Sequence, residues 1–468
     1  MSKFSLIYLC SFFLLLAVLS FFNIIYSYYF NLYLNVDTYI YTFIISLIIG
    51  CGFLFKKKKE NKISIFEKIS LVIIGYLILP LVISIPFFLS IYNISFIDCY
   101  FEAISGFTST GFTIFDNVRH LDQSLILWRS SSQWIGGLYF LFSIILLIDV
   151  FDDNLKKSLT DFLSFNTSEM FKQSSKVLIL YTILSFIIFL ILKLIDFRTF
   201  NALNLSLSLI SSGGFLPTNG IDKIINTDFK KVIFSIIMLI SFFSIFLSYN
   251  LTFIKKKNLN VFFEDFYLLI YLVFVIIIFF IFFNYNENFI DILFSISSSV
   301  SNIGLSFQNS NSDLYFIFLL LVIIGGSFFS TSSGIRFIKL FTLIKFSIND
   351  LLSHTNPKQI LISKMTFSEK NIEQKDINKY FFTIIIFIIS LLTITSLLLI
   401  SNINLDNAFR LGILTIMNTV NSSIYGLENF DFFNLNNFSK LTLIVFMIIG
   451  RVELLTILIL FKKFLFKN

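Results

Sequence analysis

The sequence predicts an all-α integral membrane protein with about ten transmembrane helices. Three observations support this prediction. The composition is too apolar for a water-soluble chain, about ten apolar segments are long enough to cross a bilayer, and four shorter semi-apolar segments lie between pairs of them. Together they indicate two helices at the N-terminus, followed by four similar units that each contain a helix, a short re-entrant segment and a second helix.

The composition excludes several classes of protein. Of the 468 residues, 56% are hydrophobic and only 13% are charged, whereas soluble globular proteins carry about 25% charge. A cytosolic enzyme, a disordered chain and a secreted disulfide scaffold are therefore excluded. The three cysteines lack CxxC spacing, and only two histidines are present, so we expect no zinc site and no His-based catalysis. The protein is not expected to be an enzyme or to hold a resident cofactor.

The distribution of basic residues predicts the orientation of the spans. A helix needs about 20 apolar residues to cross the bilayer. Segments of about this length lie at residues 4–30, 39–55, 69–90, 125–151, 177–195, 232–253, 266–283, 314–340, 381–400 and 441–461. With a cytoplasmic N-terminus, 25 of the 35 Lys and Arg residues fall on the cytoplasmic side. This bias predicts an even number of spans with both termini in the cytoplasm, so the net charge of +7 reflects topology and predicts no nucleic-acid partner.

Four outer connections contain a short semi-apolar segment followed by a polar turn with a glycine. The segments are residues 96–107, 200–209, 289–300 and 405–420. The candidate turn residues are Ser109, Thr110, Gly111, Ser212, Gly213, Gly214, Asn302, Ile303, Gly304, Ile424, Tyr425 and Gly426. This repeat divides the chain into two extra helices (residues 1–62) and four units (63–160, 161–258, 259–375 and 376–468).

The recurrence of these turns predicts a central pore. Irregular backbone is tolerated at membrane depth only where it lines a protein-enclosed or water-filled cavity. Four turns around one axis can present carbonyl oxygens that replace the hydration shell of a monovalent cation. One such turn alone is more often an ordinary loop, and a broken-helix solute transporter remains an alternative. That alternative predicts two inverted halves rather than four similar units.

Several motifs resemble those of the Trk/Ktr/HKT family of potassium transporters, and the two extra N-terminal helices favour its TrkH branch. The run Phe101-Glu102-Ala103-Ile104-Ser105-Gly106-Phe107-Thr108-Ser109-Thr110-Gly111 resembles the first pore loop, together with Leu127-Trp128-Arg129-Ser130 and Gln133-Trp134-Ile135-Gly136-Gly137 in the next span. The glycine-rich segment after residue 324 resembles a break in a helix of the third unit. Gly450-Arg451-Val452-Glu453 matches the Gly-Arg-x-Glu of the last helix.

The resemblance implies partners and a gate. It implies a homodimer in the bacterial inner membrane, in which each protomer has its own pore, regulated by a cytoplasmic ring of nucleotide-binding TrkA-type subunits. It also implies an intramembrane gating segment with an arginine near the ion path, formed here by Gly325, Gly326, Ser327, Ser330, Thr331, Gly334 and Arg451. The small residues alone could instead mark a close contact between helices. The arginine could likewise serve only to join neighbouring helices, with no role in gating.

The resemblance also implies the transported ion. Gly111 in the first turn favours K⁺ over Na⁺. The function indicated is therefore K⁺ uptake through a four-turn selectivity filter, either channel-like or ion-coupled, with a Na⁺-permeable or Na⁺/H⁺-coupled cation transporter of the same fold as the alternative. The fourth turn departs from the family pattern, because Ile424 and Tyr425 precede its glycine where Asn-rich residues are more usual.

Overall fold

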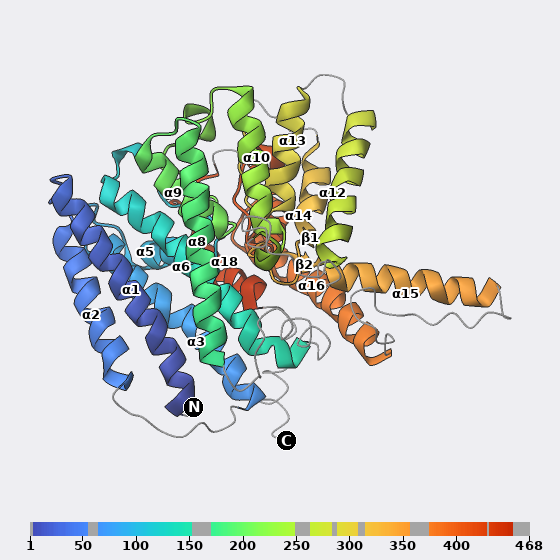
Figure 1. Ribbon diagram of the computed structural model, residues 1–468, viewed down its shortest axis with the longest axis horizontal. Helices are drawn as coiled ribbons and strands as arrows, with labels where there is room; N and C mark the ends of the chain where they lie inside the picture. The colour runs from blue at the N-terminus through green and yellow to red at the C-terminus, as the bar shows by residue number, and fades with distance from the viewer. Residues whose placement is uncertain are drawn as a thin grey trace.

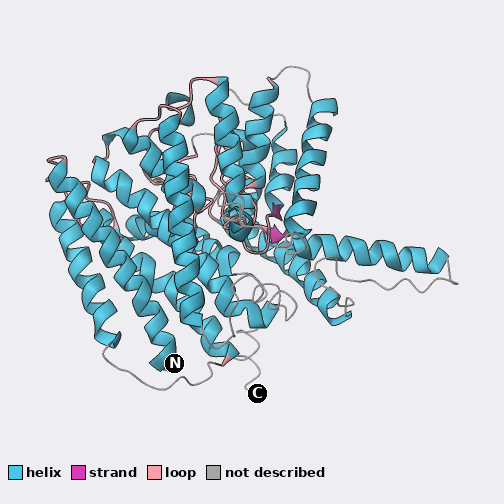
Figure 2. Ribbon diagram, viewed as in Figure 1, coloured by secondary structure: helices cyan, strands magenta, loops and turns pink. Residues whose placement is uncertain are grey.

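The structure, a computed structural model, is almost entirely helical (Figures 1 and 2). It describes residues 3–54, 64–151, 170–248, 263–282, 288–307, 314–355, 374–427 and 430–452. Six helices within these ranges are long and apolar enough to cross a membrane: Tyr8–Tyr29, Ile65–Phe88, Gln123–Leu147, Ser174–Leu194, Glu264–Ile281 and Asp376–Ile400. The protein is thus a multi-pass membrane protein of the predicted all-α class. The expected total of about ten spans remains a prediction.

The helices follow one order four times along the described chain. The N-terminal pair α1 (Lys3–Tyr29) and α2 (Val36–Leu54) precedes this pattern and lies side by side at one edge of the molecule (Figure 1). The four units are α3 (Ile65–Ile83), α5 (Phe96–Phe107) and α6 (Gln123–Phe151); α8 (Met170–Leu194), α9 (Thr199–Ile210) and α10 (Asp228–Phe242); α12 (Phe263–Phe282), α13 (Phe289–Val300) and α14 (Tyr315–Ile323); and α16 (Gln374–Ile400), α17 (Leu405–Ile416) and α18 (Asn437–Val452).

The remaining described elements are short or lie beside these units. α4 (Ile85–Phe88) continues α3 after a break, and 3₁₀ turns lie at Val118–His120, Ile221–Lys223 and Ser423–Tyr425. After α14, the two-residue strands β1 (Ile324–Gly325) and β2 (Ile335–Arg336) pair in parallel. α15 (Phe337–Thr355) follows β2 and extends away from the body of the molecule (Figure 1).

The middle helix of each unit has 12 residues and ends in the same way. A helix of that length is about 18 Å long, too short to cross a bilayer core about 30 Å thick. Two residues beyond each helix, the chain adopts left-handed φ angles at Ser109 (58°), Ser212 (57°), Asn302 (59°) and Asn418 (47°). A single left-handed residue at this position ends a helix by turning the chain away from its axis.

The fourth short helix ends earlier than the sequence predicted. It was expected to run over residues 405–420, but α17 ends at Ile416 because Asn418 is left-handed. Asparagine tolerates this conformation better than most side chains, since its short amide can hydrogen-bond locally. The predicted glycine turn at residues 423–427 therefore lies beyond the turn that ends the helix.

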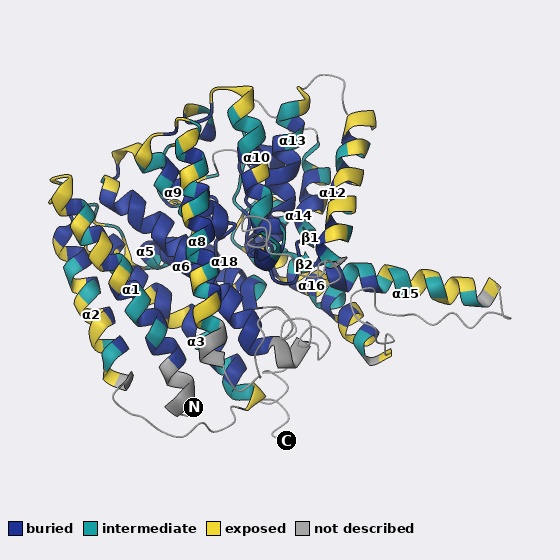
Figure 3. Cartoon of the chain, in the orientation of Figure 1, coloured by how far each residue is buried: buried dark blue, intermediate teal, exposed yellow. Residues whose placement is uncertain are grey.

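Burial separates lipid-facing helices from an enclosed one (Figure 3). Only 28% of the apolar window of α16 is buried inside the protein, whereas the window Gln123–Leu147 of α6 is 100% buried. α6 packs against helices of its own unit, the second unit and the N-terminal pair. Its polar residues therefore face protein and not lipid, which brings them to the site described next.

Candidate functional site

The four turns that follow the short helices meet at one place in the centre of the molecule. We call residues 109–111, 212–214, 302–304 and 418–420 the turn ring. Side-chain hydrogen bonds join three neighbouring pairs of turns: Ser212 Oγ donates to the Ser301 carbonyl (2.5 Å), Asn302 Nδ2 to Thr419 Oγ1 (3.3 Å), and Asn418 Nδ2 to Thr110 Oγ1 (3.0 Å). The first and second turns approach so closely that a Cβ added to Gly111 would lie 3.4 Å from the Gly214 nitrogen. The four turns thus form a closed ring in chain order.

Nine of the twelve turn residues predicted from the sequence lie in this ring. They are Ser109, Thr110, Gly111, Ser212, Gly213, Gly214, Asn302, Ile303 and Gly304, and all are buried. Two of the glycines are required by conformation, since φ is 78° at Gly111 and 80° at Gly304, values that other residues adopt only with strain. At Gly214 there is no room for a side chain, because an added Cβ would lie 2.8 Å from the Ile303 carbonyl oxygen.

The fourth turn has a different register from the one predicted. Asn418, Thr419 and Val420 complete the ring, and an added Cβ at Gly304 would lie 2.6 Å from the Val420 oxygen. The predicted residues Ile424, Tyr425 and Gly426 lie beside the ring, in and after the 3₁₀ turn Ser423–Tyr425.

Gly426 explains why the sequence favoured residues 424–426. It is left-handed (φ 67°), as expected for a turn glycine, but its carbonyl accepts a hydrogen bond from Arg410 Nη1 at 2.8 Å. The helix-ending residue of the fourth unit is Asn418, which an asparagine-based search for the turn would have found.

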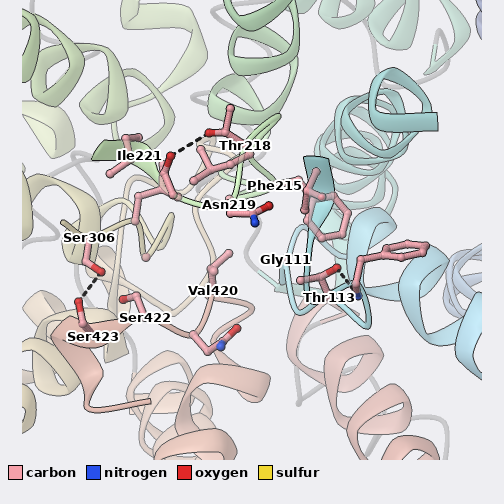
Figure 4. Close-up of a pocket in the computed structure, with 18 of the residues that line it drawn as sticks. Gly111, Thr113, Phe215, Thr218, Asn219, Ile221, Ser306, Val420, Ser422 and Ser423 are labelled. Atoms are coloured by element: carbon pink, nitrogen blue, oxygen red, sulfur yellow. Dashed lines mark hydrogen bonds between the residues drawn. The ribbon is translucent and has the colours of Figure 1, made fainter. Parts of the chain in front are cut away.

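A cavity of about 430 Å³ opens beside the ring (Figure 4). The last residue of each turn lines it, namely Gly111, Gly214, Gly304 and Val420. Acidic and polar side chains that follow the turns also line it, including Thr113, Asp116, Asn219 and Asp222, together with apolar ones such as Phe215. The ring is therefore reached through a largely polar vestibule.

A buried ion pair fixes the segment that follows the first turn. Arg129 of α6 and Glu102 of α5 are joined by Nε and Oε1 at 2.8 Å, with 1% and 0% of their side chains exposed. Glu102 also accepts a hydrogen bond from the Ile114 backbone (2.9 Å), and Arg129 Nη2 donates to Thr113 Oγ1 (2.9 Å). Charge-assisted bonds in a buried site are strong when each charge is also hydrogen-bonded. The sequence contained both residues in its motifs but gave no sign that they pair.

The segment between β1 and β2 lies against the inner side of the ring. The parallel pairing of Ile324 with Ile335 leaves the nine residues 326–334 as a loop, which we call the inner loop. Thr331 Oγ1 donates to the Ile210 carbonyl at the end of α9 (2.8 Å). The Ser332 nitrogen donates to the Ser241 carbonyl near the end of α10 (3.1 Å). The loop therefore touches the helix that leads into the second turn.

Two ionisable side chains satisfy the backbone of the inner loop. Arg336 Nη1 donates to the carbonyl oxygens of Ser327 (3.0 Å) and Ser332 (3.1 Å). The Glu264 carboxylate accepts from the Phe328 nitrogen (2.9 Å) and from Ser327 Oγ (3.2 Å). Such partners are necessary because unpaired backbone groups in a membrane interior cost several kcal/mol each. The sequence did not identify Glu264.

Arg451 lies between the inner loop and the ring. It is 1% exposed, and Nη1 donates to Ser333 Oγ in the loop. Nη2 is 3.4 Å from both Ser109 Oγ and the Ser211 carbonyl. The expected gating residues Gly325, Gly326, Ser327, Ser330, Thr331, Gly334 and Arg451 are thus gathered in one region next to the turns, while Glu453 lies outside the described residues.

This arrangement defines a class of protein. It is a multi-pass helical membrane protein in which four irregular turns meet at one place beside a polar vestibule, and irregular backbone at membrane depth lines protein-enclosed or water-filled cavities.

Comparison with known proteins shows what this chain is similar to. Residues 308–467 match the TrkH family model, described as cation transport protein. The chain is 26% identical to the uncharacterized cation transporter MJ1485 of Methanocaldococcus jannaschii, over 94% of this chain and 91% of the relative. It is 24% identical to the Trk system potassium uptake protein TrkG of Escherichia coli, over 91% of each chain. It shares its fold with the crystal structure of the potassium transporter TrkH from Vibrio parahaemolyticus (TM-score 0.78, 21% identity, 98% of each chain). The resemblance to the TrkH family is confirmed.

Proposed function

We propose that this protein takes up K⁺ across the membrane and that the turn ring is its selectivity filter. The observation that carries the proposal is the closed ring of four turns at the ends of four short helices. Helix C-termini carry partial negative charge, so α5, α9, α13 and α17 favour a cation between them. The names of relatives such as TrkG, a potassium uptake protein, support K⁺ as that cation. K⁺ is cargo in this proposal.

The filter residues in this proposal are those of the turn ring. Residues 109–111, 212–214 and 302–304 keep the roles expected from the sequence. Residues 418–420 replace Ile424, Tyr425 and Gly426, because residues 418–420 contact the other three turns. Each of the four units, 63–160, 161–258, 259–375 and 376–468, then contributes one turn. Inward movement of K⁺ is driven by the membrane potential, which is worth about 2.3 kcal/mol per charge at 100 mV.

The inner loop is the gate in this proposal. A cation that leaves the ring on its inner side meets residues 326–334 and the Arg451 guanidinium, which repels it. The contacts of Arg451 with Ser333 and Ser109 support this role, because they join the loop to the ring. Displacement of the loop would therefore release the Arg451 side chain from Ser333, so that it can turn away from the ring and open the path.

The protein acts as a homodimer in the bacterial inner membrane, with both termini in the cytoplasm and a nucleotide-binding TrkA-type ring on that side. Support for a second copy comes from α15, where Ile344 (59% exposed), Ile348 (50%) and Leu351 (67%) lie along one helix face. Support for the Trk assignment comes from relatives named as members of Trk systems. Chemical cross-linking at α15 in membranes tests the dimer independently of transport.

Potassium uptake tests the main proposal. The chain, expressed with a TrkA-type subunit in Escherichia coli lacking its own K⁺ uptake systems, is expected to restore growth at low K⁺. Reversal potentials in mixed K⁺ and Na⁺ then distinguish K⁺ selectivity from a Na⁺-permeable pore of the same fold. Good membrane expression without uptake of K⁺ or its analogue Rb⁺ would contradict the proposal.

A further inference from the structure

Val420 stands where the other three turns have glycine. In every turn, the residue after the left-handed one donates its N–H back into the short helix: Thr110 to Ser105 (2.9 Å), Gly213 to Ser208 (2.8 Å), Ile303 to Ser298 (3.1 Å) and Thr419 to Leu414 (2.9 Å). This common bond aligns the four turns residue by residue. The next position is Gly111, Gly214, Gly304 and Val420, so one of the four equivalent positions carries a side chain.

The valine side chain lies among the three glycines. A Cβ added to Gly111 or to Gly214 would overlap Cγ2 of Val420. A Cβ added to Gly304 would lie 2.6 Å from the oxygen of Val420 and 3.0 Å from its nitrogen. Since all three glycines meet the same residue, the isopropyl group occupies the middle of the ring, at the vestibule (Figure 4).

The backbone at this position accepts a β-branched residue. Gly111 and Gly304 have positive φ, but Val420 is not among the described residues with positive φ. Branching at Cβ restricts the side-chain rotamers of valine, so its methyl groups have little freedom to move. The isopropyl group is therefore a stiff, permanent part of the ring.

We infer that Val420 is an apolar constriction at the outer mouth of the ring, which limits the rate of cation entry and disfavours the larger cations. This inference rests on the proposed function. A cation must lose water to pass the ring, and an isopropyl group supplies no oxygen in exchange. Hydrophobic constrictions hinder ions by excluding water. A fixed side chain also narrows the path, which hinders the larger Cs⁺ more than K⁺.

Ion flux in liposomes tests this inference with the full-length protein. Val420→Ala removes two methyl groups from the ring. It is expected to raise K⁺ flux about tenfold, equivalent to about 1.4 kcal/mol in the barrier, and to raise the Cs⁺/K⁺ flux ratio. Val232→Ala is the matched control, because Val232 in α10 is half-buried like Val420 and loses the same two methyl groups outside the vestibule lining. It is expected to leave both quantities unchanged.

A second variant covers the case in which the alanine protein does not fold. Val420→Thr keeps the size of the side chain and adds an oxygen that can contact the ion, so K⁺ flux is expected to rise. K⁺ flux and Cs⁺/K⁺ ratios equal to wild type in the folded variant or variants would overturn the constriction while leaving K⁺ transport intact. A wild-type protein that passes Na⁺ but no K⁺ would overturn the proposed function instead, and the same variants compared on Na⁺ flux would still decide the role of Val420.

Discussion

Lys440 of α18 and Asp98 of α5 form a buried ion pair, with Nζ and Oδ1 2.5 Å apart and 4% and 10% of the two side chains exposed. The two residues are 342 positions apart. Lys440 also donates to the Phe433 carbonyl (2.7 Å), and Asp98 Oδ2 accepts from Ser95 Oγ (2.7 Å). The pair joins the first short helix to the last helix of the fourth unit, which fixes the first and fourth turns relative to each other.

Breaking this pair should destabilise the protein. Lys440→Met leaves the Asp98 carboxylate buried without its charged partner, and removal of one member of a buried pair typically costs about 3–5 kcal/mol. Thermal unfolding of the purified protein in detergent measures the effect. Lys223→Met, at a solvent-exposed position, serves as the control. Equal melting temperatures for the two variants would contradict the structural role of the pair.

Replacing Glu102 by glutamine should weaken the first turn. Glu102→Gln keeps the shape of the side chain but leaves Arg129 as an unpaired buried charge, and a loss of about 3–5 kcal/mol is expected. The segment after the turn, from residue 113, should exchange its amide hydrogens faster. Asp116→Asn is the control because Asp116 is exposed and lines the same vestibule. Unchanged exchange in the Glu102 variant would refute the role assigned to the pair.

Asn418 and Tyr425 distinguish the two possible registers of the fourth turn. Asn418→Ala removes the bonds to Thr110 Oγ1 and to the Met447 carbonyl (2.9 Å) and forces alanine into a left-handed conformation. We expect a clear loss of K⁺/Na⁺ selectivity, measured as a shift of the reversal potential. Tyr425→Phe removes only the bond to Ser299 (3.2 Å), outside the ring, and should keep the selectivity. The reverse result would restore the register based on Gly426.

Glu264 should keep the inner loop in place. Glu264→Ala removes both acceptors that hold Ser327 and the Phe328 nitrogen, so we expect higher K⁺ flux without the regulatory subunit. Glu264→Gln retains one oxygen that can accept the Phe328 N–H and should change flux much less. Flux that falls in the alanine variant, in folded protein, would argue against a loop that blocks the path.

Two variants of Arg451 separate the effect of its positive charge from the effect of its hydrogen bonds. Arg451→Met removes the positive charge between the loop and the ring, and K⁺ flux should rise because a buried cation repels a permeating one. Arg451→Lys keeps the charge but cannot reach Ser333 and Ser109 with two separate nitrogens. Its flux should stay closer to wild type if repulsion dominates. Liposome flux at several membrane potentials measures both variants.

The sequence predicted the all-α class and three of the four turns because local signals mark them. Gly111, Gly214 and Gly304 each follow a short semi-apolar helix, and glycine is the usual residue where φ is positive or backbones approach closely. The fourth turn lacks that signal. Asn418 supplies the left-handed residue and Val420 replaces the glycine, so a search for glycine moved the prediction to Gly426, six residues farther along the chain.

The long-range contacts of the site could not be predicted in the same way. Arg129 and Glu102 lie 27 residues apart, and Lys440 and Asp98 lie on helices from opposite ends of the chain. No local sequence pattern shows which acidic residue pairs with which basic residue, because the pairing depends on how the four units pack against one another. The burial of Asp98 and Glu102 in these ion pairs is therefore visible only in the folded structure.

The parallel pairing of β1 with β2 has a mechanical consequence. Because Ile324 lies beside Ile335 and Gly325 beside Arg336, the chain enters and leaves the inner loop at one point and in one direction. Residues 326–334 can therefore change shape while the ends of α14 and α15 stay together. In the proposed gating, such a loop moves about one fixed point, so it can clear the passage while β1 and β2 stay paired.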